Sequence, residues 1–383
     1  MLTDDSTPID VEIHTSESAF QLLCKEWNEL AAHQNPSSLF FYFQWFDAAW
    51  EWKKQDSMLK IIIVRSSAGI IAIAPFTTRA VPLFGIKIHQ LEFLTVPDTQ
   101  ECDILCRPGC EQTAAISISR YLKESTDWDI AKLGKLLPDA FCMSALPPAL
   151  ADCSLRHSVV SNEENFMIPM ADDWSTYYSR RSRRLKKGNN LISNRLKQAF
   201  EKIEVQWLHG KNICEDELRQ VVEDLAATSS KSWKGDCTET TFDNKGPQAF
   251  LSRLVKNAAE QGWLSVWRLE LNSQCVATEL QLIHNGTIAA LRADFDNELS
   301  KHSPGTYLNW KILERLFDEQ SFVEYRMGPG SNNYKLRWSE KTLSLSEVTV
   351  YGSSLKARYV YFVEKVVRPV YRKLKSRAST PAD

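Results

Sequence analysis

The feature that most constrains the fold is an Asn-Gly pair, Asn285-Gly286, between two apolar runs, VATELQLIH and TIAALRADF. Both residues of such a pair readily adopt positive φ angles, which a two-residue hairpin turn requires. The two runs are therefore predicted to be antiparallel strands. An amphipathic helix and a further strand, VEYRMG, follow them. The apolar face of that helix is formed by Leu308, Ile312, Leu313 and Leu316.

The same helix is predicted to begin in a loop rich in Ser, Thr and Gly. The backbone N–H groups of a first helical turn lack intrahelical partners, and the helix dipole is positive there. Such a helix start can bind an anion, and it is suited to a pyrophosphate. The candidate cofactor-binding residues are Ser303, Pro304, Gly305, Thr306 and Tyr307.

Composition narrows the class of protein. The 383 residues are long enough for two domains, and 43% apolar with 25% charged residues is ordinary for a globular protein. A net charge of −2 gives no overall attraction to nucleic acid. The polar N-terminus and the lack of an 18-residue apolar run predict a cytoplasmic chain without a membrane span.

Nine cysteines without a small disulfide scaffold favour reduced thiols. Cys102, Cys106 and Cys110 recur every four residues, as metal ligands sometimes do. However, Pro108 and Gly109 interrupt any helix between them, and no Cys or His pair follows at a zinc-site spacing. We therefore expect no metal.

An internal repeat organises the chain. Strands over 59–64, 70–77 and 88–94, a helix over 114–122 and a strand over 128–133 repeat the order of the later stretch. Even the closing strands, WDIAKLG and VEYRMG, are alike. Residues 1–150 are thus predicted to form a first unit that serves as scaffold or binds the acceptor. Residues 151–353 form the second unit, residues 354–383 form a tail, and the proline-containing stretch 137–152 is predicted to be a linker.

Three segments allow two interpretations. The aromatic run Phe40–Trp52 is predicted to be a buried core helix, with a stacking platform as the alternative. The cations of 180–187 suggest either phosphate, glycan, lipid or nucleic-acid binding or a solvated helix face. The basic amphipathic tail, 355–377, suggests either peripheral contact with an anionic membrane, at the inner face, or docking on the protein.

The stretches FDNELSKHSPGTYL and GPGSNNYKLRW resemble the GNAT-type acyltransferase domain of the CelD/BcsL-like group, which is linked to bacterial cellulose and exopolysaccharide biosynthesis and related to Fem-type aminoacyltransferases. The matching residues are Phe295-Asp296, Ser303-Pro304-Gly305, Gly328-x-Gly330, Tyr334-Lys335 and Trp338. The chain has Arg326 where that family often has an acidic residue. The resemblance implies an α/β (α+β) fold of two tandem GNAT-like units, each a mixed central sheet flanked by helices. It also implies acyl-CoA, acetyl-CoA in the simplest case, as donor.

Acyl transfer needs a base for the acceptor and a proton for the departing thiolate. Glu279 and Asp294 are the candidate bases, since both lie on or beside apolar strands that could raise a carboxyl pKa. Alternatively, Glu279 pairs with Arg292 across the hairpin. Tyr334 is the candidate proton donor, by resemblance, and Lys335 could hold a phosphate or an acidic acceptor.

Three functions remain open. The first is transfer of an acyl group from acyl-CoA to an amine or hydroxyl of a glycan precursor or small molecule. The second is Fem-like transfer from aminoacyl-tRNA, in which the basic run 180–187 would contact the RNA; nucleic acid is otherwise not expected as a partner. The third is a catalytically silent scaffold of a polysaccharide-synthesis complex.

Overall fold

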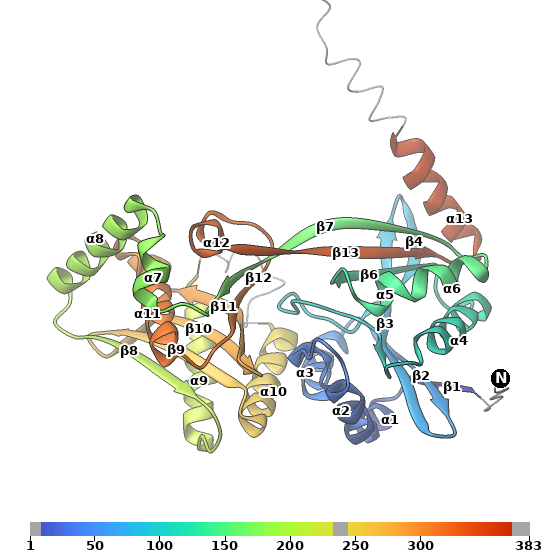
Figure 1. Cartoon of the computed structure of the whole chain (residues 1–383), viewed down its shortest axis with the longest axis horizontal. Helices are drawn as coiled ribbons and strands as arrows, with labels where there is room; N and C mark the ends of the chain where they lie inside the picture. The colour runs from blue at the N-terminus through green and yellow to red at the C-terminus, as the bar shows by residue number, and fades with distance from the viewer. Residues whose placement is uncertain (1–8, 233–243, 370–383) are drawn as a thin grey trace, which may run out of the picture.

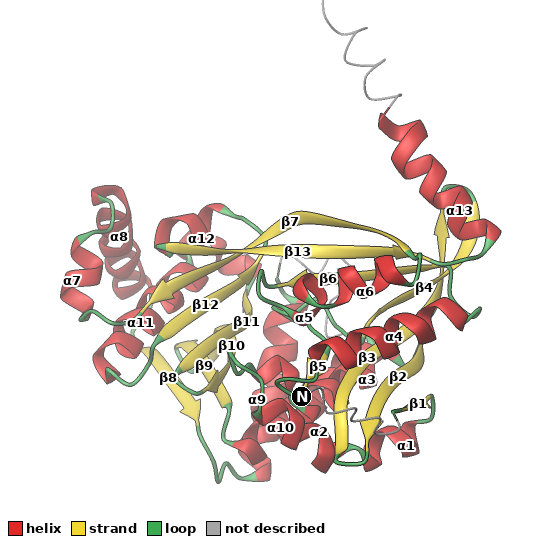
Figure 2. Cartoon of the chain, turned by 45° about the vertical axis from the view of Figure 1, so that its right-hand side comes forward, coloured by secondary structure: helices red, strands yellow, loops and turns green. Residues whose placement is uncertain are grey.

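A single mixed sheet runs through the whole molecule and joins its two halves (Figure 1). The structure is a computed structural model, and it describes residues 9–232 and 244–369. Neighbouring strands follow the order β1-β2-β3-β4-β6-β13-β7-β12-β11-β10-β9-β8, and β5 pairs with β3. Helices flank the sheet, as Figure 2 shows.

The strands have the following bounds: β1 Asp10–His14, β2 Met58–Ser66, β3 Gly69–Leu83, β4 Ile86–Phe93, β5 Leu105–Cys106, β6 Ile130–Leu136, β7 Arg156–Pro169, β8 Ile203–His209, β9 Leu264–Leu271, β10 Gln274–His284, β11 Thr287–Phe295, β12 Glu324–Pro329 and β13 Lys341–Tyr351. The longer helices are α1 Glu17–Leu22, α2 Cys24–Ala32, α3 Phe43–Lys53, α4 Glu111–Glu124, α6 Leu146–Asp152, α7 Trp174–Ser179, α8 Arg183–Ala199, α9 Glu215–Ser230, α10 Lys245–Gln261, α11 Pro304–Glu319, α12 Asn333–Trp338 and α13 Leu355–Phe362. Short helical turns are η1 Leu39–Phe41, α5 Phe141–Ser144, η3 Asn297–His302 and η4 Val363–Val367.

The two halves of the sheet have the same strand connectivity when each is followed from its outer edge inward. This confirms the predicted two-unit α/β fold. In the first half, β1 to β4 form an antiparallel meander, and α4 then leads to β6, parallel to β4. In the second half, β8 to β11 form the same meander, and α11 leads to β12, parallel to β11. The repeat seen in the sequence is therefore a repeat of structure.

Two long central strands, β7 and β13, are exchanged between the halves. β7 follows the first unit in sequence but pairs with β12, and β13 follows β12 but pairs with β6. The two strands also pair with each other, from Lys341 opposite Met167 to Tyr351 opposite Arg156. The predicted division at residue 150 falls inside α6, and each unit borrows a strand. The ranges 1–150 and 151–353 thus remain a proposal about domains.

The sequence-based prediction was wrong for residues 137–152 and for β7, which lie next to each other in the chain. Residues 137–152, predicted to be a linker, contain α5 and α6, because Pro147 and Pro148 occupy the first turn of α6, where proline is tolerated. The strand β7 was not predicted at all. Its first nine residues are mostly exposed or half-buried, so they carry no apolar alternation to reveal a strand.

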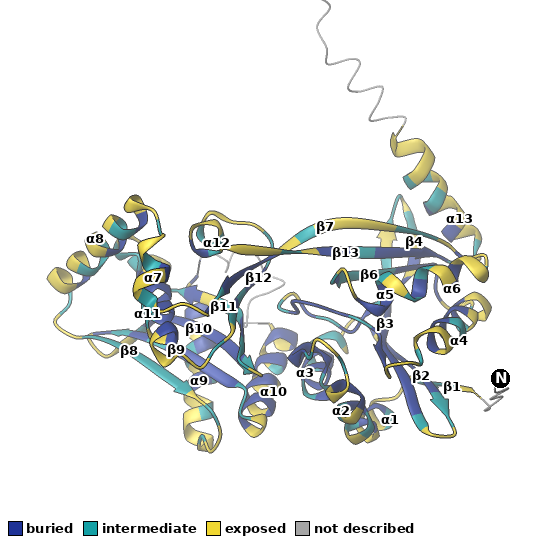
Figure 3. Cartoon of the chain, viewed as in Figure 1, coloured by how far each residue is buried: buried dark blue, intermediate teal, exposed yellow. Residues whose placement is uncertain are grey.

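The aromatic run is a core helix, as predicted. Phe43, Trp45 and Phe46 of α3 are buried, and Trp45 meets Phe250 of α10 edge to face at 5.7 Å between ring centroids. This contact joins the first unit to the second. Figure 3 shows the two helices, α3 and α10, side by side. A stacking platform for ligands is therefore not what these rings form.

The described tail is short. α13 and η4 expose Leu355, Tyr359 and Phe362 among other apolar side chains, while residues from 370 onward lie outside the described ranges. In residues 9–232 and 244–369, no helix combines the length and the apolar character needed to cross a bilayer. Membrane contact through 355–377 stays a prediction.

Candidate functional site

The candidate site lies where two parallel strands separate. β11 and β12 pair only from Thr287 opposite Glu324 to Ala289 opposite Arg326, although β11 continues to Phe295. A cavity of about 400 Å³ opens beyond the last pair. Its lining comes from both strands, from β10 and from the helices that follow them: Thr278, Glu279, Ala290, Leu291, Arg292, Ala293, Asp294, Phe295, Gly305, Thr306, Leu308, Asn309, Met327, Asn332, Tyr334 and Lys335.

A glutamine from the first unit lies between the two strands where they separate. The fully buried Gln100 donates from Nε2 to the carbonyl oxygen of Ala290 at 2.8 Å, the first β11 residue beyond the paired part. A Cβ on Gly328 of β12 would lie 3.5 Å from the same Nε2. The Gln100 amide therefore sits between β11 and β12 and satisfies a carbonyl that the missing ladder leaves without a partner.

Two ion pairs fix the loop that carries Gln100. Asp98 binds Arg292 of β11 at 2.9 Å, and Glu101 binds Arg326 of β12 at 2.9 Å. Both acids and both arginines are largely buried. Residues 98–101, named the wedge loop below, thus clamp one strand on each side of the opening. The role of Arg326, at the position where the resembling family often has an acid, is this structural pair.

Glu279 lies in this cavity with its carboxylate almost fully enclosed, at 2% exposure. It accepts hydrogen bonds from the Tyr325 hydroxyl and from Nε2 of Gln281, the latter at 2.7 Å. Burial raises the pKa of Glu279 above its usual value, against the opposing effect of these hydrogen bonds. The sequence prediction that Glu279 is a base stays a prediction, and its raised pKa is consistent with that role.

The cross-strand pair between Glu279 and Arg292 does not form. The β10–β11 register sets Glu279 opposite Ala293, with an irregularity at the next residue, and Arg292 opposite Leu280. Arg292 binds Asp98 instead. That alternative was wrong because the partner of Arg292 comes from the other unit, which sequence spacing cannot show.

Tyr334 and Asn309 form the opposite wall. The Nδ2 of Asn309, in α11, donates to the Tyr334 hydroxyl at 2.6 Å, and desolvation raises the pKa of Tyr334 well above its usual value. The buried Oδ1 of Asn309 has no hydrogen-bond partner among the described residues. Sequence reasoning missed Asn309, although it lies one helical turn after Gly305, on the same face.

The other predicted site residues fall into two groups, those that line the cavity and those that do not. Asp294, Lys335, Gly305 and Thr306 line the cavity, whereas Ser303, Pro304 and Tyr307 are not in its lining. Lys335 donates from Nζ to the carbonyl oxygens of Gly328 at 2.8 Å and Pro329 at 2.6 Å, which closes the turn after β12. Gly305 must be glycine, because a Cβ there would lie 2.9 Å from the Phe295 ring.

α11 begins at the position that was predicted from the sequence. The helix begins at Pro304, and the side chain of Ser303 makes no capping hydrogen bond. Pro304 has no N–H, so the first N–H groups of the helix are those of Gly305 and Thr306, two residues that line the cavity. The helix start and the separated strands together have the shape of a site for a long ligand with an anionic part.

Comparison with known proteins agrees with this geometry. Residues 192–336 match the acetyltransferase (GNAT) domain. This range holds β8 to β12, α11 and the entire cavity apart from the wedge loop behind it. No curated protein matches the chain. No comparison bears on the CelD/BcsL-like group, so that narrower resemblance stays a prediction.

Solved structures share the fold of nearly the whole chain. FemX aligns with a TM-score of 0.55 at 9% identity, over 88% of this chain and 96% of that one. The C-terminal domain of a putative lysylphosphatidylglycerol synthetase from Agrobacterium fabrum aligns with 0.52 at 10%, over 89% and 95%. A Bacteroides thetaiotaomicron protein of unknown function aligns with 0.51 at 12%, over 89% and 100%. At these identities the likeness concerns the fold.

The basic run does not form a single helical face. α7 ends before it, Ser182 caps α8, and the helix resumes only at Arg183. Arg180 binds Asp172 at 2.6 Å and Glu340 at 3.2 Å, and Arg181 binds Glu340. Arg180 and Arg184 therefore do not share one helical face, because the serine cap interrupts the helix between them.

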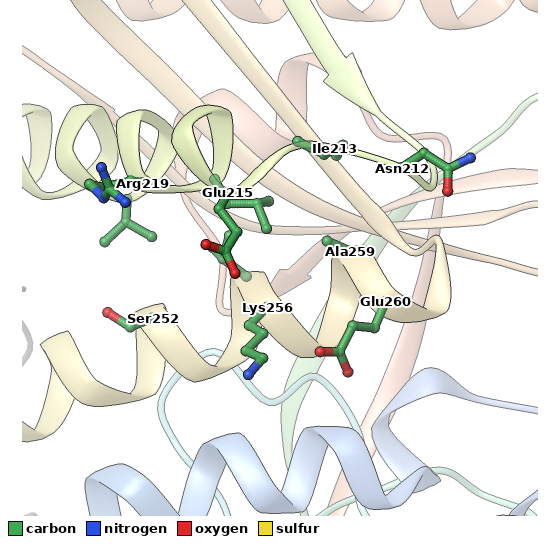
Figure 4. A pocket seen from close by; sticks show the side chains of 11 residues that line it. Asn212, Ile213, Glu215, Arg219, Ser252, Lys256, Ala259 and Glu260 are labelled. Carbon is green, nitrogen blue, oxygen red and sulfur yellow. The ribbon is translucent and has the colours of Figure 1, made fainter.

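Neither the cysteines nor a second cavity adds to this site. The described residues contain no group of three or more His, Cys, Asp or Glu side chains placed to hold a metal ion. Burial raises the pKa of Cys102 and of Cys106 to about 12, so both stay thiols. The second cavity, of about 490 Å³ between α9 and α10, mixes Glu215 and Glu260 with Lys256 (Figure 4). It shares no lining residue with the first cavity.

Proposed function

We propose that this protein transfers an acyl group from acyl-CoA to an amine or hydroxyl, with the cavity between β11 and β12 as its active site. The observation that carries the proposal is the separation of two parallel strands beside a free helix start, inside a segment that matches the GNAT domain. We expect a pantetheine arm to lie between the strands, along the cavity that Asn309 helps to line. The acyl thioester would then lie beside Glu279.

The reaction would proceed by direct attack. Glu279, in its ionised form, accepts the proton of the acceptor N–H or O–H, and the acceptor forms a bond to the acyl carbon. The thioester oxygen gathers negative charge as that bond forms, and it returns this charge when the C=O bond re-forms and the C–S bond breaks. Tyr334, whose raised pKa keeps its proton in place at neutral pH, donates that proton to the thiolate of CoA. Asn309 holds the Tyr334 oxygen in position.

Asp294 is a second candidate base, since it lies in the same lining and is buried. Glu279 is preferred because burial raises its pKa toward neutrality, where a general base is most effective. The acceptor expected from the sequence, a glycan precursor or small amine, remains part of the proposal.

The competing proposal is transfer from aminoacyl-tRNA, which the fold shared with FemX and the putative lysylphosphatidylglycerol synthetase domain favours. Calorimetric titration with acetyl-CoA separates the two. Saturable binding with turnover of a panel of amines and sugars supports the acyl-CoA proposal. No heat and no thermal shift at millimolar acetyl-CoA, together with salt-sensitive tRNA binding, would replace it.

A further inference from the structure

The last helical segment that the structure describes, α13 followed by η4, has apolar side chains on two opposite sides. Ala357 and Val360 are fully buried and pack with Ile88 of β4, Ile130 of β6 and Tyr351 of β13. This side is docked on the half of the sheet to which the first unit contributes most strands. Figure 1 shows α13 projecting from that half, at the end of the molecule opposite α8.

Polar contacts fix the orientation of this helix. The Ser354 hydroxyl caps it, because its oxygen accepts the N–H of Ala357 at 3.0 Å and its O–H donates to a carboxylate oxygen of Asp129 at 2.6 Å. In η4, the Glu364 carboxylate accepts a hydrogen bond from the Tyr351 hydroxyl at 2.6 Å. Since the segment is held at its start and again in η4, its outer side faces a fixed direction.

The outer side of α13 carries large exposed apolar side chains. Leu355, Tyr359 and Phe362 are 81%, 43% and 53% exposed, and intervals of four and three residues place them on one helical face. Ala357 lies two residues from both Leu355 and Tyr359, about half a turn away, so the exposed face is opposite the docked one. Two exposed valines of η4, Val366 and Val367, extend the apolar surface. Apolar side chains that gather on one exposed face, unlike scattered ones, mark an interaction surface.

The charge around this face is strongly positive. Residues 355–369 contain one acid, Glu364, whose carboxylate already binds Tyr351, and four exposed cations: Lys356, Arg358, Lys365 and Arg368. The sequence from 370 to 377 adds further cations and no acid. A second copy of this face would bring like charges together, whereas an anionic lipid surface attracts them. The charges therefore favour a lipid surface over a second copy of the chain.

We propose that the outer face of α13 and η4 binds an anionic membrane surface while the opposite face stays docked on the sheet. Leu355 and Phe362 enter the boundary between lipid headgroups and acyl chains, and the cations meet the lipid phosphates. From the sequence, membrane contact and docking on the protein were alternatives, and the two faces of α13 make them compatible. The proposal does not depend on the acyl-transfer function.

The test is co-sedimentation of the full chain with lipid vesicles. The wild type should bind vesicles that contain phosphatidylglycerol, and both added salt and pure phosphatidylcholine should weaken that binding. Leu355→Gln/Phe362→Gln should bind at least about tenfold more weakly, because two large apolar side chains no longer enter the lipid. Both side chains are exposed, so thermal unfolding should be unchanged. Leu22→Gln, on the 84% exposed leucine of α1, is the matched control and should bind like the wild type.

A second variant, Lys356→Gln/Lys365→Gln, isolates the electrostatic part. It should bind the anionic vesicles about tenfold more weakly and with less dependence on salt, while its binding to phosphatidylcholine stays the same. A wild type that does not sediment with anionic vesicles would overturn the proposal, as would equal binding by the wild type and Leu355→Gln/Phe362→Gln. Concentration-dependent dimers in analytical ultracentrifugation, lost in that variant and accompanied by no vesicle binding, would assign the face to a second copy instead.

Discussion

At the scale of single residues, the proposed chemistry depends on how strongly the cavity shifts the pKa values of Glu279 and Tyr334. Both groups have raised pKa values with desolvation as the largest cause. For an acid, this means that the protonated form is favoured over a wider pH range. Tyr334 therefore keeps its proton, whereas Glu279 becomes a base only once the pH passes its raised pKa.

Glu279→Gln tests the base. Turnover should fall by about 10² to 10⁴, the usual contribution of a general base, and the acidic limb of the kcat/KM profile should disappear. Asp294→Asn is the comparison that identifies the base. If Asp294→Asn removes the acidic limb and Glu279→Gln leaves it in place, the assignment of Glu279 is wrong.

The same substitution has a predictable effect on stability. A carboxyl whose folded pKa is raised stabilises the fold below its unfolded pKa, near 4.5, and loses that contribution as the pH rises through the folded value. The melting temperature of Glu279→Gln relative to wild type should therefore increase between pH 4 and pH 8. A constant difference across that range would mean that Glu279 does not titrate with a raised pKa.

Tyr334→Phe tests the acid. Because the change removes one hydroxyl and keeps the ring, kcat should fall while the Kd for CoA changes little. The dependence of kcat on pH that comes from protonation of the leaving thiolate should be lost as well. Asn309→Ala, which removes the group that positions the Tyr334 hydroxyl, should lower kcat in the same direction. Wild-type turnover by Tyr334→Phe would exclude Tyr334 as proton donor.

At the scale of elements, the site depends on the wedge loop between β4 and β5. Gln100 replaces the ladder hydrogen bond that β12 does not supply to Ala290, and Asp98 and Glu101 anchor the loop to both strands. The first unit therefore contributes directly to the shape of the second unit's cavity. The first unit thus helps to shape the cavity, whereas the scaffold or acceptor-binding role predicted for it stays a prediction.

Gln100→Ala should leave the Ala290 carbonyl buried without a partner, at a cost of about 1–3 kcal/mol in unfolding free energy. It should also let β11 and β12 approach, so the affinity for CoA should fall. Gln100→Glu offers a matched change, since it keeps the volume but removes the donor. Unchanged CoA affinity in both variants would show that the strands stay apart without the wedge.

At the scale of the whole molecule, the exchange of β7 and β13 makes the two units one cooperative body. Each unit's sheet is completed by a strand that comes from beyond its own repeat, and α3 and α10 share a core. We therefore expect a single calorimetric unfolding transition. Phe250→Ala, in that shared core, should cost about 3–5 kcal/mol and shift the whole transition. Two separate transitions, with only one of them shifted, would contradict this.

The sequence by itself determined the local features. The Asn285-Gly286 hairpin, the helix that begins at residue 304, the buried aromatic helix and the order of the repeat follow from turn chemistry and side-chain periodicity. Glu279 and Asp294 were found because carboxylates on or beside apolar strands stand out, whereas Tyr334 and Lys335 belong to the motif that carries the family resemblance. All four line one cavity.

Only the tertiary structure decided what depends on distant partners. Gln100 binds the Ala290 carbonyl, 190 residues away in the sequence. Arg292 pairs with Asp98 and not with Glu279 of the hairpin. The strand β7, which is largely polar, pairs with the other unit. Hydrophobic periodicity indicates which face of an element is buried, but it does not indicate which element covers that face. For that reason the sequence located the strands of the site, and the fold alone determined what keeps them apart.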